Sequence, residues 1–103
     1  MTSAEAATFL ATGTRTGKLA VIRADGSPMV VPVWFVLDSE DMVFMTGATT
    51  LKGRAIQRDP RVSLCVDQEE PPYAFVRVDG TVHVDADVAA MTPWSIAIAR
   101  RYM

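Results

Sequence analysis

Residues 28–37, PMVVPVWFVL, constrain the fold most, because they form an apolar run of strand length beside a strong turn signal. The strand-like residues 18–23 precede them, and the intervening Asp25–Gly26 is a dipeptide typical of tight β-hairpins. We therefore expect residues 18–23 and 28–37 to pair as an antiparallel hairpin. A strand that is apolar on both faces needs a core on one side and a helix, a cofactor or a second subunit on the other. In a chain of 103 residues we favour a second subunit as this cover.

The remaining patterns indicate short strands and few helices. We expect a helix over 4–11 capped by Ser3, a strand over 42–46 after a turn at 38–41, a helix over 51–58, a strand over 62–67, a strand over 73–84 bent near Gly80, and a last helix from the cap Asp87 to Tyr102 with Pro93 as a break or second start. This order predicts a mainly β fold, an antiparallel barrel that is closed or nearly closed. Pro32 cannot donate to a ladder, so we expect a bulge or a local opening there.

The composition is that of one folded domain, residues 1–103. A formal net charge of −2 argues against a nucleic-acid partner. The single cysteine, Cys65, excludes an intrachain disulfide and a multi-cysteine zinc site, and we expect no metal. No apolar run approaches the ~20 residues that a membrane span needs, and the N-terminus lacks the pattern of a secretory signal. We therefore expect a cytoplasmic protein without a membrane partner.

The segment 46–61, TGATTLKGRAIQRDPR, holds the best candidate for chemistry. The hydroxyls of Thr49 and Thr50 precede a predicted helix that carries Lys52 in its first turn. The start of a helix offers unpaired N–H groups and the positive end of the helix dipole. Hydroxyl donors and a lysine at such a place suit an anion, most naturally a phosphate. An ordinary capped helix with a surface lysine explains the same residues about equally well.

Basic residues recur around this helix and near the N-terminus. Arg54, Arg58 and Arg61 form either a solvated face or a holder for a polyanionic tail. Residues 13–18, GTRTGK, are similar to a phosphate-binding loop only superficially, because three residues separate the glycines and Leu19 stands where Ser or Thr is required. We therefore expect residues 13–18 to form a turn.

Other reactive side chains are interpreted as structural. His83 lies on the solvent face of its predicted strand and has no visible partners for a triad or a metal site. Cys65 is expected to be a small buried hydrophobe in an apolar strand, and Glu69–Glu70 to lie in a solvated loop. The sequence thus contains no recognisable set of catalytic side chains.

Four stretches in this order resemble the pyridoxamine 5′-phosphate oxidase-like split β-barrel family: residues 19–35, 43–67, 71–84 and 94–103. The phrases KGR followed by RDPRV, and PPYAFVRVDGT, carry the resemblance most clearly. No single motif is diagnostic, but the ordered set is specific and covers almost the whole chain. Within this family, the sequence is most similar to the actinobacterial branch that binds the deazaflavin coenzyme F420.

The resemblance implies a split β-barrel that forms a homodimer with two cofactor sites at the subunit interface. The implied cofactor is F420, with FMN as the alternative. The lysine-bearing helix start would hold the cofactor phosphate, the tricyclic ring would lie along the second strand, and the partner subunit would contribute residues 72–75. The implied cofactor-binding residues are Pro32, Val33, Trp34, Thr46, Gly47, Thr50, Leu51, Lys52, Arg54, Pro72, Tyr73 and Phe75.

The resemblance also implies an activity, the transfer of a hydride from reduced F420 to a conjugated, small-molecule organic acceptor. Trp34, Tyr73 and Phe75 would line a slot for the acceptor, and Tyr73 is a candidate proton donor. An FMN-binding flavoprotein and a non-enzymatic carrier of F420 or flavin are the alternatives. The sequence does not identify the acceptor.

Two departures from the family pattern accompany the resemblance. Family chains normally continue through a further strand after the last helix, so we expect residues 1–103 to be a domain truncated at its C-terminus relative to the family. The late basic residues with which pyridoxamine phosphate oxidases hold the substrate phosphate are not identifiable. That particular activity is therefore not expected.

Overall fold

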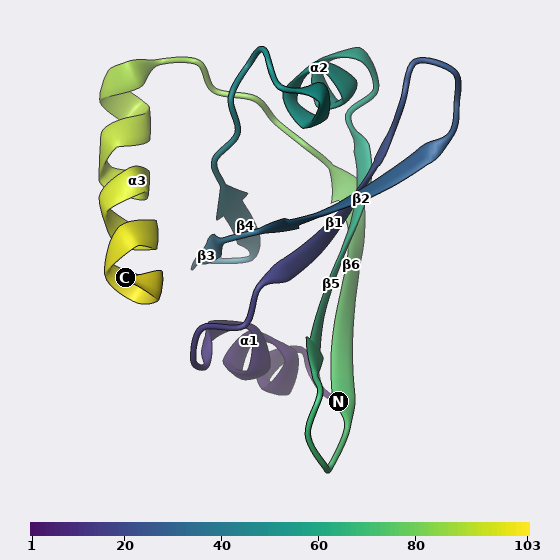
Figure 1. Cartoon of the computed structure of the whole chain (residues 1–103). Coiled ribbons are helices and arrows are strands. Elements are labelled where there is room, and N and C mark those ends of the chain that lie inside the picture. The colour runs from purple at the N-terminus through teal and green to yellow at the C-terminus, as the bar shows by residue number, and fades with distance from the viewer.

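The computed structural model describes residues 1–103 (Figure 1). Six strands form two antiparallel sheets, and three helices pack around them. One sheet has the strand order β2-β1-β5-β6, and the other consists of β3 and β4. The predicted mainly β, split-barrel architecture is confirmed. The elements are α1 Ser3–Ala11, β1 Gly17–Ile22, β2 Pro28–Val33, β3 Phe35–Asp38, β4 Asp41–Phe44, α2 Leu51–Arg58, β5 Arg61–Gln68, β6 Ala74–Thr81 and α3 Val88–Tyr102.

The β1–β2 hairpin forms where the sequence predicts it. Gly26 adopts a positive φ of 84°, which only glycine adopts without strain, and the Arg23 amide donates to the Ser27 carbonyl at 2.8 Å. The strands then pair without interruption from Ile22 with Pro28 to Gly17 with Val33. The turn dipeptide therefore sets the register of the first two strands.

The expected single strand over residues 28–37 is wrong, because the chain leaves the first sheet at Trp34. Strand β2 ends at Val33, and β3 begins at Phe35 in the other sheet. The expected bulge at Pro32 is also wrong, since the pairing with β1 is continuous through it. Pro32 is tolerated because β2 is an edge strand, where a missing donor costs little.

The core lies between the inner face of the larger sheet and α2. Alternate residues of β1 and β5, among them Leu19, Val21 and Val66, are fully buried, as the period of a half-covered strand requires. Ile56 packs against them from α2, and the wholly buried ring of Phe35 reaches them from β3. The change of sheet at Trp34 thus places the first residue of β3 in the core.

The helices differ from expectation in detail. Thr2, rather than Ser3, caps α1 and forms a reciprocal capping box with Glu5. Asp87 caps α3 as predicted, but Pro93 does not break this helix. The last two turns of α3 are anchored to the rest of the protein, as described below.

Two strands have other boundaries than expected, and both end earlier in the sequence. β4 spans Asp41–Phe44 instead of 42–46, and β6 spans Ala74–Thr81 instead of 73–84. His83 is exposed as predicted, but it lies beyond the end of β6 rather than within a strand. Cys65 is half-buried instead of buried.

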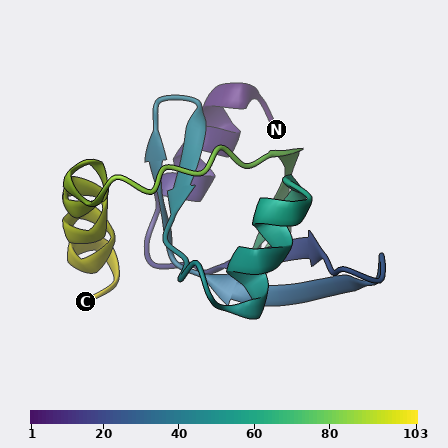
Figure 2. The ribbon, with the colours of Figure 1, turned by 90° about the horizontal axis from the view of Figure 1, so that it is seen from above.

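The helices occupy different sides of the sheets. α1 and α2 lie at opposite ends of the larger sheet, and α3 stands beside the small β3–β4 sheet (Figure 1). Figure 2 shows that the connection from β6 to α3 crosses over to this side as an extended segment. None of the helices has the length and apolar character needed to cross a membrane.

Candidate functional site

A cavity of about 300 Å³ lies where β2, the end of β4, α2 and α3 meet. It brings together two groups of predicted cofactor-binding residues, the strand segment Pro32–Trp34 and the helix residue Lys52. These groups are separated in the sequence and meet only because β2 ends beside the start of α2. The lining residues are Pro32, Val33, Trp34, Met45, Lys52 and Ile98.

The start of α2 is shaped by Thr50, which caps the helix. Its hydroxyl accepts a hydrogen bond from the Gly53 amide at 3.0 Å and donates one to the Gly47 carbonyl at 2.7 Å. This hydroxyl is therefore used within the loop and is not the free donor that the anion-site hypothesis envisaged. The amides of Leu51 and Lys52 occupy the first helical positions, which have no partner inside a helix.

The loop before α2 packs directly onto the helix. Gly53 is buried, and a Cβ atom added there would lie far inside contact distance of the Gly47 carbonyl oxygen. The Gln57 side chain adds a hydrogen bond to the Ala48 carbonyl at 3.1 Å. The absence of a side chain at Gly53 thus lets residues 47–50 close over the first turn of α2, next to Lys52.

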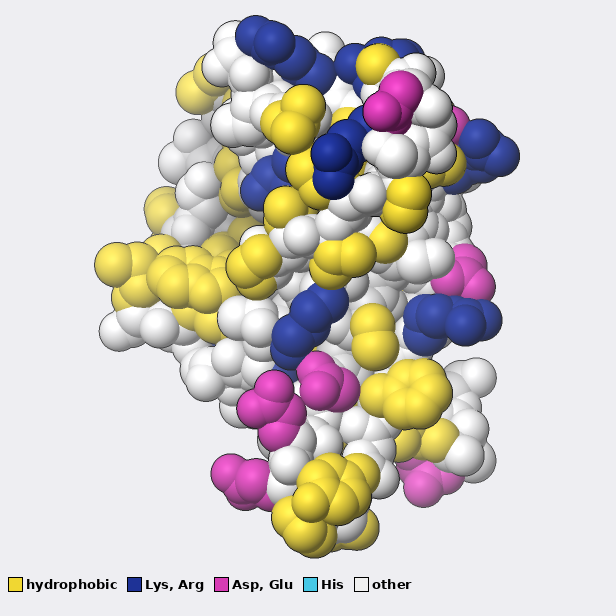
Figure 3. All heavy atoms as spheres, turned by 45° about the vertical axis from the view of Figure 1, so that its right-hand side comes forward, with side chains coloured by type: hydrophobic (Ala, Val, Ile, Leu, Met, Phe, Trp, Pro, Cys, Tyr) yellow, Lys and Arg dark blue, Asp and Glu magenta, His cyan; other side chains and the backbone are white.

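The charges around α2 are unbalanced. Lys52, Arg54 and Arg58 are the charged residues of this helix, and none of them forms an ion pair. Arg61 differs, because its guanidinium binds Asp59 and thereby lowers the pKa of that carboxyl to about 2. Figure 3 shows Lys and Arg side chains concentrated toward the end of the molecule that carries α2. An anion at the start of α2 would therefore meet uncompensated positive charge.

The remaining predicted site residues lie away from this cavity. Pro72, Tyr73 and Phe75 lie at the start of β6 and the loop before it, and none of them lines the cavity. Tyr73 is 74% and Phe75 is 66% exposed. Thr46 and Gly47 belong to the loop before α2, and Arg54 is exposed on that helix. Within one chain, the structure thus unites the strand and helix groups but not the β6 group.

Sequence reasoning missed the contribution of the residue that follows β4 and of α3. Met45 and Ile98 line the cavity, and the indole of Trp34 is stacked on the ring of Tyr102. The apolar spacing of Ile98 and Tyr102, one helical turn apart, is a signal for a buried helix face. It did not reveal which part of the protein that face covers.

Comparison with solved structures gives two informative matches. The conserved hypothetical protein Rv2991 from Mycobacterium tuberculosis matches with a TM-score of 0.90 and 28% identity, covering 100% of this chain and 65% of that one. An F420 reductase matches with a TM-score of 0.79 and 29% identity over 92% of this chain and 75% of the other. The family model described as pyridoxamine 5′-phosphate oxidase matches residues 2–103. The chain belongs to this family.

Within the pyridoxamine 5′-phosphate oxidase family, the solved relatives differ in the cofactor they are named for. An FAD-binding protein from Mesorhizobium loti matches with a TM-score of 0.74 and 25% identity, covering 97% of this chain and 72% of that one. A comparison with curated protein sequences found no significant match. The chain spans about two thirds of the length of Rv2991, at 65%. The comparisons therefore support a flavin or deazaflavin cofactor without deciding between them.

Other kinds of site have little support in the structure. No group of three or more His, Cys, Asp or Glu side chains gathers in a way that could hold a metal ion. The lining residues of the cavity include one ionisable group, the amine of Lys52. This lining suits a ligand with its own reactivity, which the cavity would hold and orient.

Proposed function

We propose that this protein is an F420-dependent oxidoreductase that transfers a hydride to a conjugated organic acceptor. The observation that carries the proposal is the meeting of Lys52 with Pro32–Trp34 around one cavity. Membership of the pyridoxamine 5′-phosphate oxidase family and 29% identity to an F420 reductase support it. We expect the protein to be cytoplasmic.

The residues at the cavity suit a phosphate-bearing cofactor with a flat ring. The unpaired amine of Lys52 and the amides at the start of α2 would hold the phosphate, with Arg54 nearby on the same helix. Pro32, Val33 and Trp34 would support the ring and exclude water from one side. The volume of about 300 Å³ is at the low end for ligand pockets and suits part of the cofactor, with the rest over the surface of α2.

The chemistry would come from the cofactor, which supplies the hydride when bound. The protein residues would bind the phosphate, orient the ring and leave an apolar slot for the acceptor. Tyr73 remains our candidate for the proton donor, and in one chain it lies outside the cavity. It would serve the site of a partner subunit.

Titration with F420 and with FMN, followed by fluorescence, tests the cofactor assignment. Lys52→Ala should weaken binding roughly 10- to 100-fold, because a hydrogen bond from a charged donor is lost. Its thermal unfolding should barely change, since the amine forms no ion pair. Arg23→Ala, which removes an equal charge from the exposed β1–β2 turn, is the matched control. Unchanged affinity in Lys52→Ala would exclude the phosphate role.

Two alternative functions would use the same site. An FMN-binding flavoprotein is supported by the FAD-binding relative, and tight binding of FMN without F420 would favour it. A non-enzymatic carrier would bind the cofactor without turnover. Supplying the reduced cofactor with quinones, tetrapyrroles and unsaturated lactones separates a carrier from an enzyme, because only an enzyme would oxidise the cofactor in an acceptor-dependent way.

We also propose that two copies form a homodimer. Tyr73, Phe75 and Val30 are large apolar side chains that are more than 60% exposed on the strands and adjoining loop of the larger sheet. Burial of such side chains is favourable by roughly 1.5–3 kcal/mol each. Sedimentation analysis should show a dimer that Phe75→Asp converts to a folded monomer. A wild-type monomer at high concentration would exclude the dimer.

A further inference from the structure

Trp34 lies at the point where the chain passes from one sheet to the other, and its indole is stacked on the ring of Tyr102. The ring centroids are 5.0 Å apart and the ring planes differ by 2°. Trp34 also lines the cavity and is 45% exposed. A planar ring has two faces, and Tyr102 covers one of them. The other face and the ring edge are therefore what the cavity and the solvent meet.

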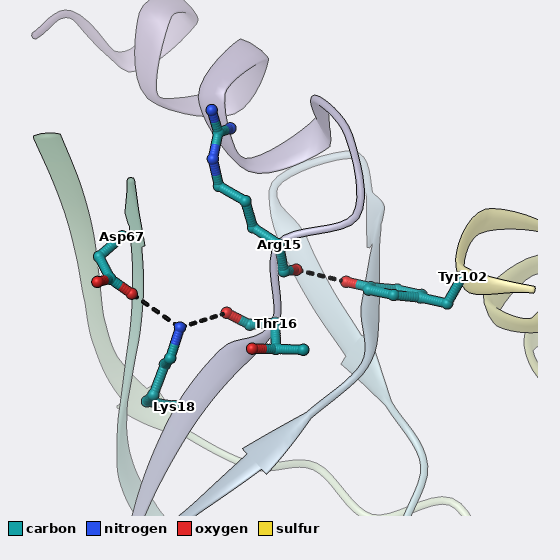
Figure 4. Close-up of polar contacts among 5 residues, drawn as sticks. All are labelled: Arg15, Thr16, Lys18, Asp67 and Tyr102. Carbon is teal, nitrogen blue, oxygen red and sulfur yellow. Dashed lines mark hydrogen bonds and ion pairs between the residues drawn. The ribbon is translucent and has the colours of Figure 1, made fainter. Parts of the chain in front are cut away.

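Tyr102 is itself held by two hydrogen bonds, in which its hydroxyl group is once the donor and once the acceptor. The hydroxyl donates to the Arg15 carbonyl at 2.8 Å, as Figure 4 shows, and accepts a longer bond from the Phe35 amide at 3.4 Å. Phe35 directly follows Trp34 in the chain. The same phenol thus contacts the indole through its ring and the adjoining backbone through its oxygen.

The acceptor of this hydrogen bond belongs to a fixed segment. Next to Arg15, the Thr16 carbonyl accepts a hydrogen bond from the Lys18 amine, which also pairs with Asp67 of β5 at 2.8 Å (Figure 4). The segment before β1 is thereby tied to the larger sheet. The position of the Tyr102 ring is consequently set by the sheet and not by α3 alone.

We propose that Tyr102 is a positioning residue, which holds the indole of Trp34 in the plane that a cavity ligand meets. The identity of the ligand as a flat-ringed cofactor rests on the proposed function, whereas the link between the two aromatic rings does not. A ligand ring placed on the open face of Trp34 would extend the Tyr102–Trp34 stack. Removing the Tyr102 ring would free the indole and lower the affinity for such a ligand.

The first test uses the protein without ligand. In a Trp94→Phe background Trp34 is the single tryptophan, so acrylamide quenching of its fluorescence and the long-wavelength edge of the near-ultraviolet circular dichroism, where tyrosine does not absorb, report on it alone. Tyr102→Met fills space without a ring and should abolish the dichroism of the stacked pair and raise quenching. Tyr102→Phe keeps the ring but lacks the hydroxyl that holds it, so its signals should lie between those of wild type and Tyr102→Met. A folded Tyr102→Met protein with unchanged signals would overturn the proposal.

Phe9→Leu is the matched control, because it removes a half-buried aromatic ring that lies against the Arg15 guanidinium and not against the Arg15 carbonyl that holds Tyr102. It should lower stability while leaving the Trp34 signals unchanged. If Phe9→Leu altered those signals as much as Tyr102→Met, the effect would be general loosening and the positioning role would be refuted.

The second test measures the dissociation constant of F420 or FMN. Tyr102→Met should raise it roughly 2- to 12-fold, the range that aromatic pairs are worth, and Tyr102→Phe should stay within about twofold. Equal affinity in Tyr102→Met and wild type would overturn the positioning role. If wild type bound neither cofactor, the proposed function would fail, and the ligand-free signals would still decide whether Tyr102 holds Trp34.

Discussion

Single residues shape the start of α2 mainly by what they leave out or use up. Gly53 lacks the side chain that would collide with the Gly47 carbonyl, and the Thr50 hydroxyl satisfies one donor and one acceptor of its own loop. What remains for an anion is the amine of Lys52 and the first amides of the helix. Binding of the proposed phosphate at the start of α2 would therefore depend on backbone shape as much as on charge.

Gly53→Ala tests this dependence on shape. An alanine in a helix is normally better than glycine by roughly 0.5–1 kcal/mol, but here its methyl group would press on the Gly47 carbonyl. We expect destabilisation of about 1–3 kcal/mol and weaker cofactor binding. Gly80→Ala is the control, since open space surrounds that position. Urea unfolding of both variants measures the difference, and equal stability of the two would contradict the close approach.

Among the elements, α3 is joined to the rest of the protein through its last turns. The Arg101 guanidinium donates to three backbone carbonyls, those of Leu10 at 2.6 Å, Gly13 at 3.0 Å and Phe35 at 2.8 Å. In contrast, Val88 at the start of the helix is largely exposed. One end of α3 thus connects the loop after α1 to the beginning of β3.

Arg101→Met should therefore destabilise the protein by about 3 kcal/mol, because several hydrogen bonds from a charged donor are lost together. The neighbouring Arg100 is exposed and forms no hydrogen bond, so Arg100→Met should change stability by no more than about 0.5 kcal/mol. Denaturant unfolding of the pair measures the contrast. Similar losses in both variants would show that the carbonyl contacts contribute little.

Elements that depend on local signals were predictable from the sequence. The hairpin follows from Asp25–Gly26, and α2 has the predicted boundaries, Leu51–Arg58. The position of the break at Trp34 was not predictable, because Pro32 indicates an irregularity two residues earlier and no glycine or turn residue stands at the change of sheet itself. Its backbone is held by Tyr102, which is 67 residues away from Phe35 in the sequence. A contact of such range leaves no mark within residues 28–37.

The candidate site was predictable to a similar degree. Lys52 and Pro32–Trp34 line one cavity, and the elements that carry them, the hairpin and α2, are both specified locally. The contributions of Met45 and Ile98 depend on how β4 and α3 pack, and periodicity alone does not determine that packing. The cofactor-binding roles predicted for Lys52, for Pro32–Trp34 and for Tyr73 and Phe75 stay predictions.

At the scale of the whole molecule, hydrogen-bonded carboxylates contribute to the response to acid. Hydrogen bonds from Arg61, Lys18 and Ser27 lower the pKa of Asp59, Asp67 and Asp25 respectively, in the case of Asp59 to about 2. A pKa that is lower in the folded protein means that folding favours the charged form. This stabilisation is complete above the unfolded pKa near 4 and is lost as the pH falls through the folded value.

We therefore expect the free energy of unfolding to be nearly constant from pH 7 to about pH 5 and to fall between about pH 4 and pH 2. In Asp59→Asn the free energy of unfolding should fall less steeply over this range, because the variant lacks the carboxyl group that takes up a proton on unfolding. Urea midpoints at a series of pH values measure the two slopes. Parallel curves for wild type and Asp59→Asn would contradict the role of the Arg61 contact.

The place of Pro32 on the edge strand β2 has a consequence for self-association. Proline in an edge strand offers no N–H to an approaching chain, so it interrupts the row of donors that another strand would need. Continued strand pairing from copy to copy would therefore be blocked along this edge, although three of the six residues of β2 are valines. The residue that borders the cavity would thus also protect the protein against fibril-like polymerisation.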